Sequence, residues 1–137
     1  MPDSDIEQLN QLLLEGKCCA SIMVQMGLSL RGERNEQMVS AVATLCNGVY
    51  NGMLCGSLSG AACMLGLFGD NPAESAEMTR ELAEWFADTY GEKYGGTDCS
   101  DITGNDPAVK NERCRAIIEA TYLQAKAILE DYGKILS

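Results

Sequence analysis

Histidine is missing from this 137-residue chain. Its absence excludes the Ser-His-Asp triad, nucleophilic Cys–His pairs, histidine-ligated haem and zinc sites that combine cysteine with histidine. Any metal bound here must therefore be held by thiolates, with or without carboxylates. Basic residues are also few, because 10 Lys and Arg stand against 20 Asp and Glu, for a formal net charge of −10. Binding to DNA or RNA relies on cations that neutralise phosphates, so we expect no nucleic-acid partner.

Long apolar runs are absent as well. No stretch of 18 apolar residues occurs, so the sequence predicts no membrane span. Residues 1–8 are acidic and lack the charged and apolar regions of a signal peptide, so we expect a cytoplasmic protein. The length is typical of one domain, which we place over residues 1–137.

No strand pattern and no internal repeat is evident, whereas apolar residues recur at helical spacing in most of the chain. The sequence predicts an all-α bundle of five to six helices around a glycine-rich central helix. We expect the helices over residues 6–15, 18–30, 33–45, 52–69, 71–90 and 106–132. Two of them begin at a capping residue followed by proline, at Asn71-Pro72 and Asp106-Pro107. The predicted loop over residues 91–106 is longer than most connections, which favours a functional loop.

The central stretch, residues 52–69, places Gly52, Gly56 and Gly60 four residues apart. On a helix these positions share one face, and each glycine costs roughly 1 kcal/mol relative to alanine. We therefore expect another backbone or a cofactor to approach this face closely. The simpler explanation is a tightly packed helix crossing, and both explanations stay open.

Seven cysteines are present, an odd number at a density below that of disulfide-rich secreted domains. A full disulfide framework is therefore not expected, and no Cys-x-x-Cys pair occurs. Cysteine is often buried as a small apolar residue, and we interpret Cys46 and Cys63 mainly in this way. Cys99 lies among Gly, Thr, Asp and Ser, where core packing explains it poorly. Cys19 and Cys55 lie near predicted helix starts, which favours their thiolate forms.

The cysteines follow an order that is recognisable: Gly-x-x-Cys-Ala, then Gly-x-x-Cys-Gly-x-x-x-Gly-Ala, then two single cysteines. This order resembles the redox-active family named C_GCAxxG_C_C, whose members come largely from anaerobic microbes. A related domain of split-Soret cytochromes is linked to an iron–sulfur centre. The matching residues are Gly16, Cys19, Ala20, Gly52, Cys55, Gly56, Gly60, Ala61, Cys99 and Cys114.

The resemblance implies that four thiolates gather around a [2Fe–2S] or [4Fe–4S] cluster used for electron transfer, with Gly56 beside it. The implied ligands are Cys19, Cys55, Cys99 and Cys114. Three cysteines are additional to the family pattern, namely Cys18, Cys46 and Cys63. As further ligands they would allow a larger or altered cluster, and as redox thiols they would allow a dithiol–disulfide step.

Two other functions remain open at this point. One is a metal-free thiol redox protein that forms a disulfide between Cys19 and Cys55 or between Cys99 and Cys114. The other is a structural zinc-binding or interaction module. A stand-alone catalyst is less favoured because no acid–base pair or phosphate loop stands out. We expect a redox partner protein with a basic docking surface, since acidic charge favours such docking. The glycine-lined face also suits a homodimer.

Overall fold

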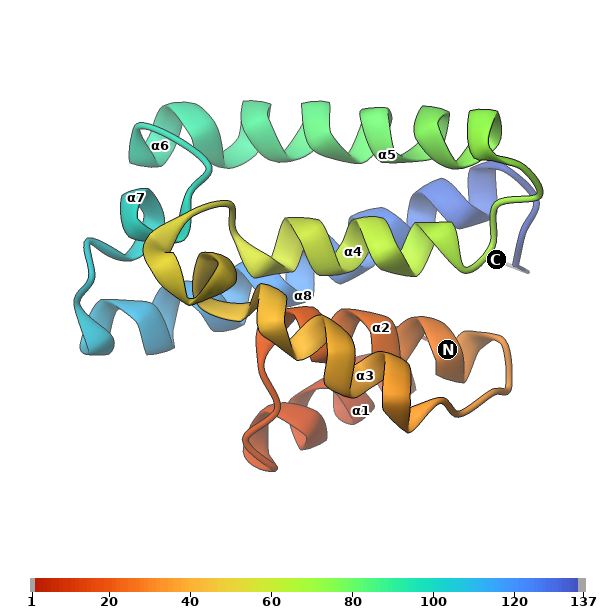
Figure 1. The fold of residues 1–137 in the computed structure, drawn as a ribbon, viewed down its shortest axis with the longest axis horizontal. Coiled ribbons are helices and arrows are strands. Elements are labelled where there is room, and N and C mark those ends of the chain that lie inside the picture. The colour runs from red at the N-terminus through yellow and green to blue at the C-terminus, as the bar shows by residue number, and fades with distance from the viewer. Residues whose placement is uncertain (1, 136–137) are drawn as a thin grey trace.

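The computed structural model describes residues 2–135, with side chains from Ser4 onward, and this part of the chain is helical with no strand (Figure 1). The prediction of an all-α fold is confirmed. The elements are α1 (Pro2–Leu14), α2 (Cys19–Leu30), α3 (Glu36–Val42), η1 (Ala43–Leu45), η2 (Gly48–Gly52), α4 (Gly56–Gly66), α5 (Pro72–Phe86), η3 (Ala87–Gly91), α6 (Glu92–Tyr94), α7 (Cys99–Thr103) and α8 (Pro107–Asp131).

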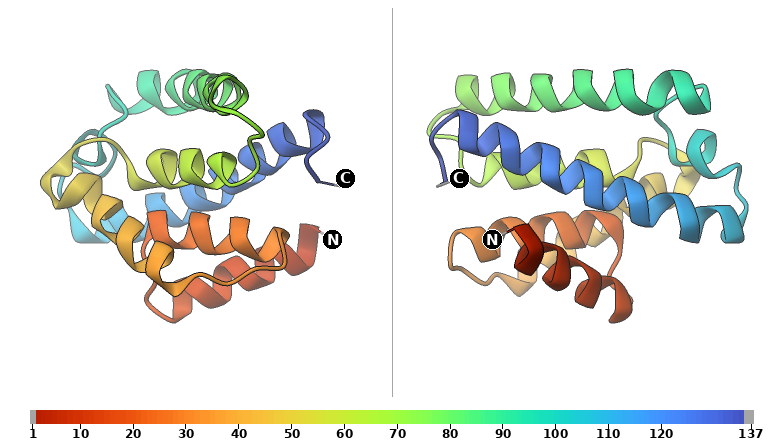
Figure 2. Two further views of the ribbon diagram at one scale, coloured as in Figure 1. Left: turned by 45° about the vertical axis from the view of Figure 1, so that its right-hand side comes forward. Right: turned by 180° about the vertical axis from the view of Figure 1, so that it is seen from behind.

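Helix α4 is the central element. It packs against α2, α5 and α8, and in Figure 1 it lies between α5 above and α2 below. Helix α8 passes behind α4 in that view and comes to the front in the rear view of Figure 2. The core between these helices is apolar. Its fully buried larger side chains are Leu9, Ile22, Met23, Met26, Met64, Leu65, Met78, Leu82, Phe86, Ile102, Tyr122 and Leu129.

Helices α2 and α4 run parallel and approach each other very closely. A Cβ atom built on Gly60 would lie 2.6 Å from the Cα of Ala20, and one built on Gly27 would lie 2.8 Å from the Cγ of Met64. Residue 20 thus faces residue 60 and residue 27 faces residue 64, so the contacts advance in the same direction along both helices. Helix α8 also starts at the same end, as Figure 1 shows. Three helix N-termini thus lie at one end of the molecule.

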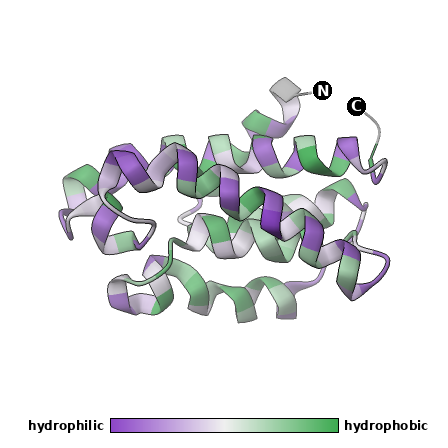
Figure 3. Ribbon diagram, turned by 90° about the horizontal axis from the view of Figure 1, so that it is seen from above, coloured by the Kyte–Doolittle hydropathy of each residue, from purple (hydrophilic) through white to green (hydrophobic). Residues whose placement is uncertain are grey.

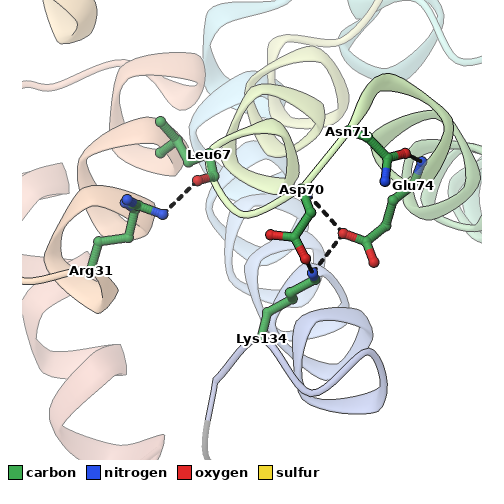
Figure 4. A network of polar contacts seen from close by, with 6 residues as sticks. All are labelled: Arg31, Leu67, Asp70, Asn71, Glu74 and Lys134. Carbon is green, nitrogen blue, oxygen red and sulfur yellow. Dashed lines mark hydrogen bonds and ion pairs between the residues drawn. The ribbon is translucent and has the colours of Figure 1, made fainter.

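Polar contacts close the opposite end, where α2 and α4 terminate (Figure 4). The Arg31 guanidinium donates to the Leu67 carbonyl at 2.7 Å, which satisfies a carbonyl at the end of α4. Lys134 forms ion pairs with Asp70 at 2.8 Å and with Glu74 at 2.6 Å. These contacts join the start of α5 to the segment that follows α8.

The capping residues predicted from the sequence lie at the starts of two helices. The Asn71 side chain caps α5 by accepting from the Glu74 N–H at 2.9 Å, and the Asp106 side chain accepts from the Ala108 N–H at 3.0 Å at the start of α8. Two expectations were wrong. Gly52 is not part of the central helix, which begins at Gly56, and the predicted loop over residues 91–106 contains α6 and α7.

Helix α2 is buried over most of its length, whereas α5 is amphipathic, with Met78, Leu82 and Phe86 buried. Hydrophilic and hydrophobic residues alternate along the helices visible in Figure 3. This pattern is expected of helices that turn one side to water and the other to a core. Across the described residues, every helix is too short or too polar to cross a membrane.

Candidate functional site

Four cysteines from four separate elements lie together at the end where α2, α4 and α8 begin. Cys19 is the first residue of α2, Cys55 is the N-cap of α4, Cys99 is the first residue of α7, and Cys114 is on α8. Charge on Cys55, Cys19 or Cys99 would act on the Cys114 thiol, and charge on Cys55 or Cys99 would act on Cys19. The four sulfurs are therefore close enough to interact electrostatically, although they are up to 95 residues apart (114 − 19 = 95). We call them the thiol group.

Backbone hydrogen bonds join the segments that carry Cys55 and Cys99. The Cys55 N–H donates to the Thr97 carbonyl at 3.0 Å, and the Cys99 N–H donates to the Met53 carbonyl at 2.6 Å. An isolated antiparallel bridge between Leu54 and Asp98 lies between these two bonds. Residues 53–55, just before α4, are thereby paired with residues 97–99, which lead into α7. This pairing brings Cys99, which lies in a polar and partly buried segment, close to the buried Cys55.

Gly56 is needed for close approach to Cys19. A Cβ atom at position 56 would lie 2.5 Å from the Cys19 Sγ, 3.1 Å from the Leu45 carbonyl oxygen and 3.3 Å from the Cys46 Cα. No side chain fits there without displacing both a sulfur and backbone. The structure therefore places Gly56 beside the thiol group and gives a steric reason for glycine at this position.

Hydrogen-bond donors surround two of the sulfurs. The backbone N–H groups of Asn47 and Ala20 donate to Cys19, and both lower the pKa of its thiol. Asn47 reaches this position from a loop in which its own φ is +55°. Cys55 accepts from the backbone N–H groups of Ser57 and Leu58 and from the Ser57 hydroxyl. These donors would stabilise negative charge on either sulfur.

Burial nevertheless dominates the ionisation of these thiols. It raises the pKa of Cys19 to about 11 and that of Cys114 to about 12, and in both cases repulsion from neighbouring thiolates adds to the increase. Burial also raises the pKa of Cys55, whose residue is only 6% exposed. The expectation that helix starts hold Cys19 and Cys55 as thiolates was therefore wrong. Both cysteines do lie at helix starts, but desolvation outweighs the favourable N–H groups.

The three additional cysteines lie outside the thiol group. Cys18 and Cys46 form a disulfide, with Cα atoms 6.1 Å apart, so neither is free to act as a ligand in this state. Cys46 is fully buried, as expected of a core residue, while its pairing with Cys18 had been left open among the possible roles of the additional thiols. The sequence indicated this pairing only in that both cysteines are additional to the four of the family pattern. Cys63 is a free thiol on α4 and is only partly buried, so the expectation of a core residue was wrong there; partial burial alone raises its pKa.

The disulfide pairs expected of a metal-free redox protein are free thiols in this structure. Cys19, Cys55, Cys99 and Cys114 are all unpaired. Among the described side chains, from Ser4 to Ile135, no set of three or more Cys, Asp or Glu is arranged to hold a metal ion.

A family model described as "Putative redox-active protein (C_GCAxxG_C_C)" matches residues 17–128, which include all four members of the thiol group. The chain belongs to the C_GCAxxG_C_C family. Neither the curated proteins nor the solved structures include a match to it. The family description assigns redox activity to proteins of this kind and names no cofactor.

The donor chemistry of the thiol group is compatible with an iron–sulfur cluster. Thiolates are the ligands that such clusters prefer, and four is the usual number. Two of the four cysteines, Cys19 and Cys55, accept hydrogen bonds from backbone N–H groups. Cys19, Cys55, Cys99 and Cys114 are the four free thiols that this end of the molecule offers as donors.

Proposed function

We propose that this C_GCAxxG_C_C protein is a small electron carrier in which Cys19, Cys55, Cys99 and Cys114 hold an iron–sulfur cluster. The observation that supports the proposal is that these four thiols, which come from four separate elements, lie near enough for charge on one to act on another. When bound, the cluster would supply one-electron chemistry that no side chain of this chain can supply.

The surrounding residues would bind and tune the group. The thiol pKa values near 11 and 12 mean that Cys19 and Cys114 are protonated at neutral pH, so loading of metal must release protons. Once the sulfurs are ligands, the N–H groups of Asn47, Ala20 and Leu58 would donate to them. Hydrogen bonds to sulfur and the extent of solvent exposure are two of the factors that set cluster potentials.

An apolar surface next to the thiol group is a suitable docking site for the electron partner. Val49, Tyr50, Met53 and Leu54 are large apolar residues that are each at least 41% exposed. They lie one to six residues before Cys55 in the chain, and residues 53–55 pair with residues 97–99. The excess negative charge of the chain favours a partner with a basic surface around this contact.

Metal and sulfide analysis of protein isolated without oxygen tests the proposal. We expect bound iron, acid-labile sulfide, visible absorbance and an electron paramagnetic resonance signal in the oxidised or the reduced state. Cys55→Ser and Cys114→Ser should lose most of the iron, while Cys63→Ser should retain it, because Cys63 is a free thiol outside the group. Colourless protein without iron would contradict the proposal, and stoichiometric zinc would favour a structural module instead.

A metal-free thiol redox protein is the second candidate, and the Cys18–Cys46 disulfide is the observation that favours it. In that case a two-electron change at a cysteine pair would replace the cluster. Thiol counting before and after reduction distinguishes the two functions. A redox cycle that changes only the thiol count, in protein without iron, would support the second candidate.

A further inference from the structure

A hollow of ≈ 320 Å³ lies beside the thiol group, between the end of α1, the start of α2 and the first half of α8. Cys19 and Cys114 are part of its lining. Its volume is at the lower end of the range for small-molecule sites.

The charge of this hollow is opposite to that of the protein. Lys17, Lys110 and Arg115 line it, and no Asp or Glu does, although the chain has twice as many acids as bases. Ion pairs among the described residues involve other bases, namely Arg31, Arg34, Lys126 and Lys134. Arg115 donates instead to the neutral Asn10 side chain at 3.2 Å. Three cations without carboxylate partners surround one small space.

The walls add an apolar component. Leu13 and Ile118 line the hollow, and Leu14, which is 79% exposed, lies at its edge. Exposed leucine next to unpaired cations suits a ligand with an aliphatic body and charged ends. Inorganic anions would use the cations and leave the leucines in water.

We propose that this hollow binds a small organic dianion, of the aliphatic dicarboxylate class. The two carboxylates would be bound by Lys110 and Arg115, with Lys17 at the entrance, and the carbon chain would contact Leu13 and Leu14. Lysine and arginine bind carboxylates through charge-assisted hydrogen bonds, and these are the stronger hydrogen bonds of proteins. The inference does not depend on whether the thiol group holds a cluster.

Equilibrium dialysis with radiolabelled adipate, on anaerobically isolated protein at low salt, tests the inference. We expect retention at about 1 mM adipate, competition by unlabelled adipate, and no competition by neutral hexanamide. Lys110→Gln and Arg115→Gln should each weaken binding about tenfold, as expected when one charge-assisted bond is lost. Arg80→Gln, an exposed base on α5 with the same loss of charge, should bind normally.

Three results would overturn the inference. The first is no retention of adipate by the unmodified protein. The second is equal binding by the Lys110, Arg115 and Arg80 variants, since this would mean that adipate binds elsewhere. The third is equally effective competition by inorganic phosphate, because the leucine wall would then make no contribution. Circular dichroism of each variant confirms that the fold is retained, and none of these outcomes depends on iron content.

Discussion

The Sγ atom of Cys19 faces the Cα of Gly56, in the space where a Cβ atom of residue 56 would come within 2.5 Å of the sulfur. This contact joins the first residue of α2 to the first residue of α4. It is a point of very close packing between these two parallel helices, and it brings a buried thiol against backbone. The arrangement of the thiol group therefore depends on the absence of a side chain at position 56 as well as on the positions of its cysteines.

Gly56→Ala is expected to move Cys19 away from α4. The added methyl group would also press on the Leu45 carbonyl and the Cys46 Cα, which are backbone atoms and yield less easily. Overpacking of this kind costs about 1–3 kcal/mol of unfolding free energy. Chemical denaturation measures this loss, and iron analysis should show reduced loading.

Gly66→Ala on the same helix is the matched control for Gly56→Ala. A Cβ atom added at Gly66 would have no neighbour within 4 Å, and the φ of this residue is not positive. Because alanine favours helix, we expect unchanged or slightly increased stability, by up to about 1 kcal/mol. Equal destabilisation by both substitutions would show that the contact with Cys19 is unimportant.

Loss of the Cys18–Cys46 disulfide is expected to destabilise the protein. The bond closes a loop with a sequence separation of 28 residues, for which the chain-entropy model gives about 3–4 kcal/mol. Denaturation of the parent protein with and without reductant should show this difference, and Cys18→Ser should resemble the reduced parent. Cys63→Ser, which removes a free thiol, should keep the response to reductant. A parent protein that is insensitive to reductant would argue against the disulfide.

Ser57→Ala is expected to raise the pKa of the Cys55 thiol further. Burial already raises this pKa, while the Ser57 hydroxyl and two backbone N–H groups oppose the increase. Loss of the hydroxyl removes one stabilising donor from the thiolate. The rate of Cys55 alkylation, resolved by mass spectrometry across a pH series in metal-free reduced protein, measures the change.

Ser59→Ala serves as the comparison for Ser57→Ala. The Ser59 hydroxyl donates to the Gly56 carbonyl at 3.5 Å and makes no contact with Cys55 that lowers its pKa. The pH dependence of Cys55 alkylation in Ser59→Ala should match that in the parent protein. Identical profiles for the two serine variants would show that the Ser57 hydroxyl has no effect on the thiol.

Asp5 is expected to make stability depend on acid pH. Burial acts to raise the pKa of this carboxyl, but hydrogen bonds from Lys126 and Tyr122 outweigh it, and the net pKa is lowered from 3.8. Because the folded state binds this proton less readily, the stabilisation is present above pH 3.8 and is lost as the pH falls through the lowered value. Asp5→Asn should reduce stability at neutral pH by about 1–3 kcal/mol.

The pH profile separates this effect from a general loss of negative charge. In Asp5→Asn, unfolding free energy should decline less steeply below pH 3.8 than in the parent. Glu84→Gln, an exposed carboxyl on α5, removes one negative charge without touching the contact between α1 and α8. It should keep the steep decline of the parent. A similar slope in both variants would contradict the role of Asp5.

Local chemistry made several elements predictable. Asn71 and Asp106 cap α5 and α8 as their sequences indicate, because a side chain that caps a helix contacts residues only two or three positions away. Gly60 also behaves as predicted, with the backbone of Ala20 against it. Gly52 was misassigned to the same helix face. Its φ of +68° belongs to the turn that precedes α4, and a turn of this kind overrides helical spacing.

The disulfide and the thiol ionisation were not predictable in this way. Cys18 and Cys46 are brought together by packing between α2 and the segment before η2, which no spacing rule describes. The pKa of Cys19 depends on burial by distant segments, and this effect exceeds that of the helix start. The sequence shows that Cys19 lies near a helix start, which lowers the thiol pKa. It gives no measure of the burial, which raises the pKa.

The amino-acid composition by itself excluded histidine as a metal ligand and left thiolates and carboxylates, and the apolar periodicity determined a helical fold. Only the tertiary structure decided which sulfurs lie near one another and which are oxidised. Cys19, Cys55, Cys99 and Cys114 gather where parallel helices begin, while Cys18 pairs with Cys46 and Cys63 stays apart. The physical reason is that contact and desolvation depend on atoms that are close in space, and these come from segments far apart in the chain.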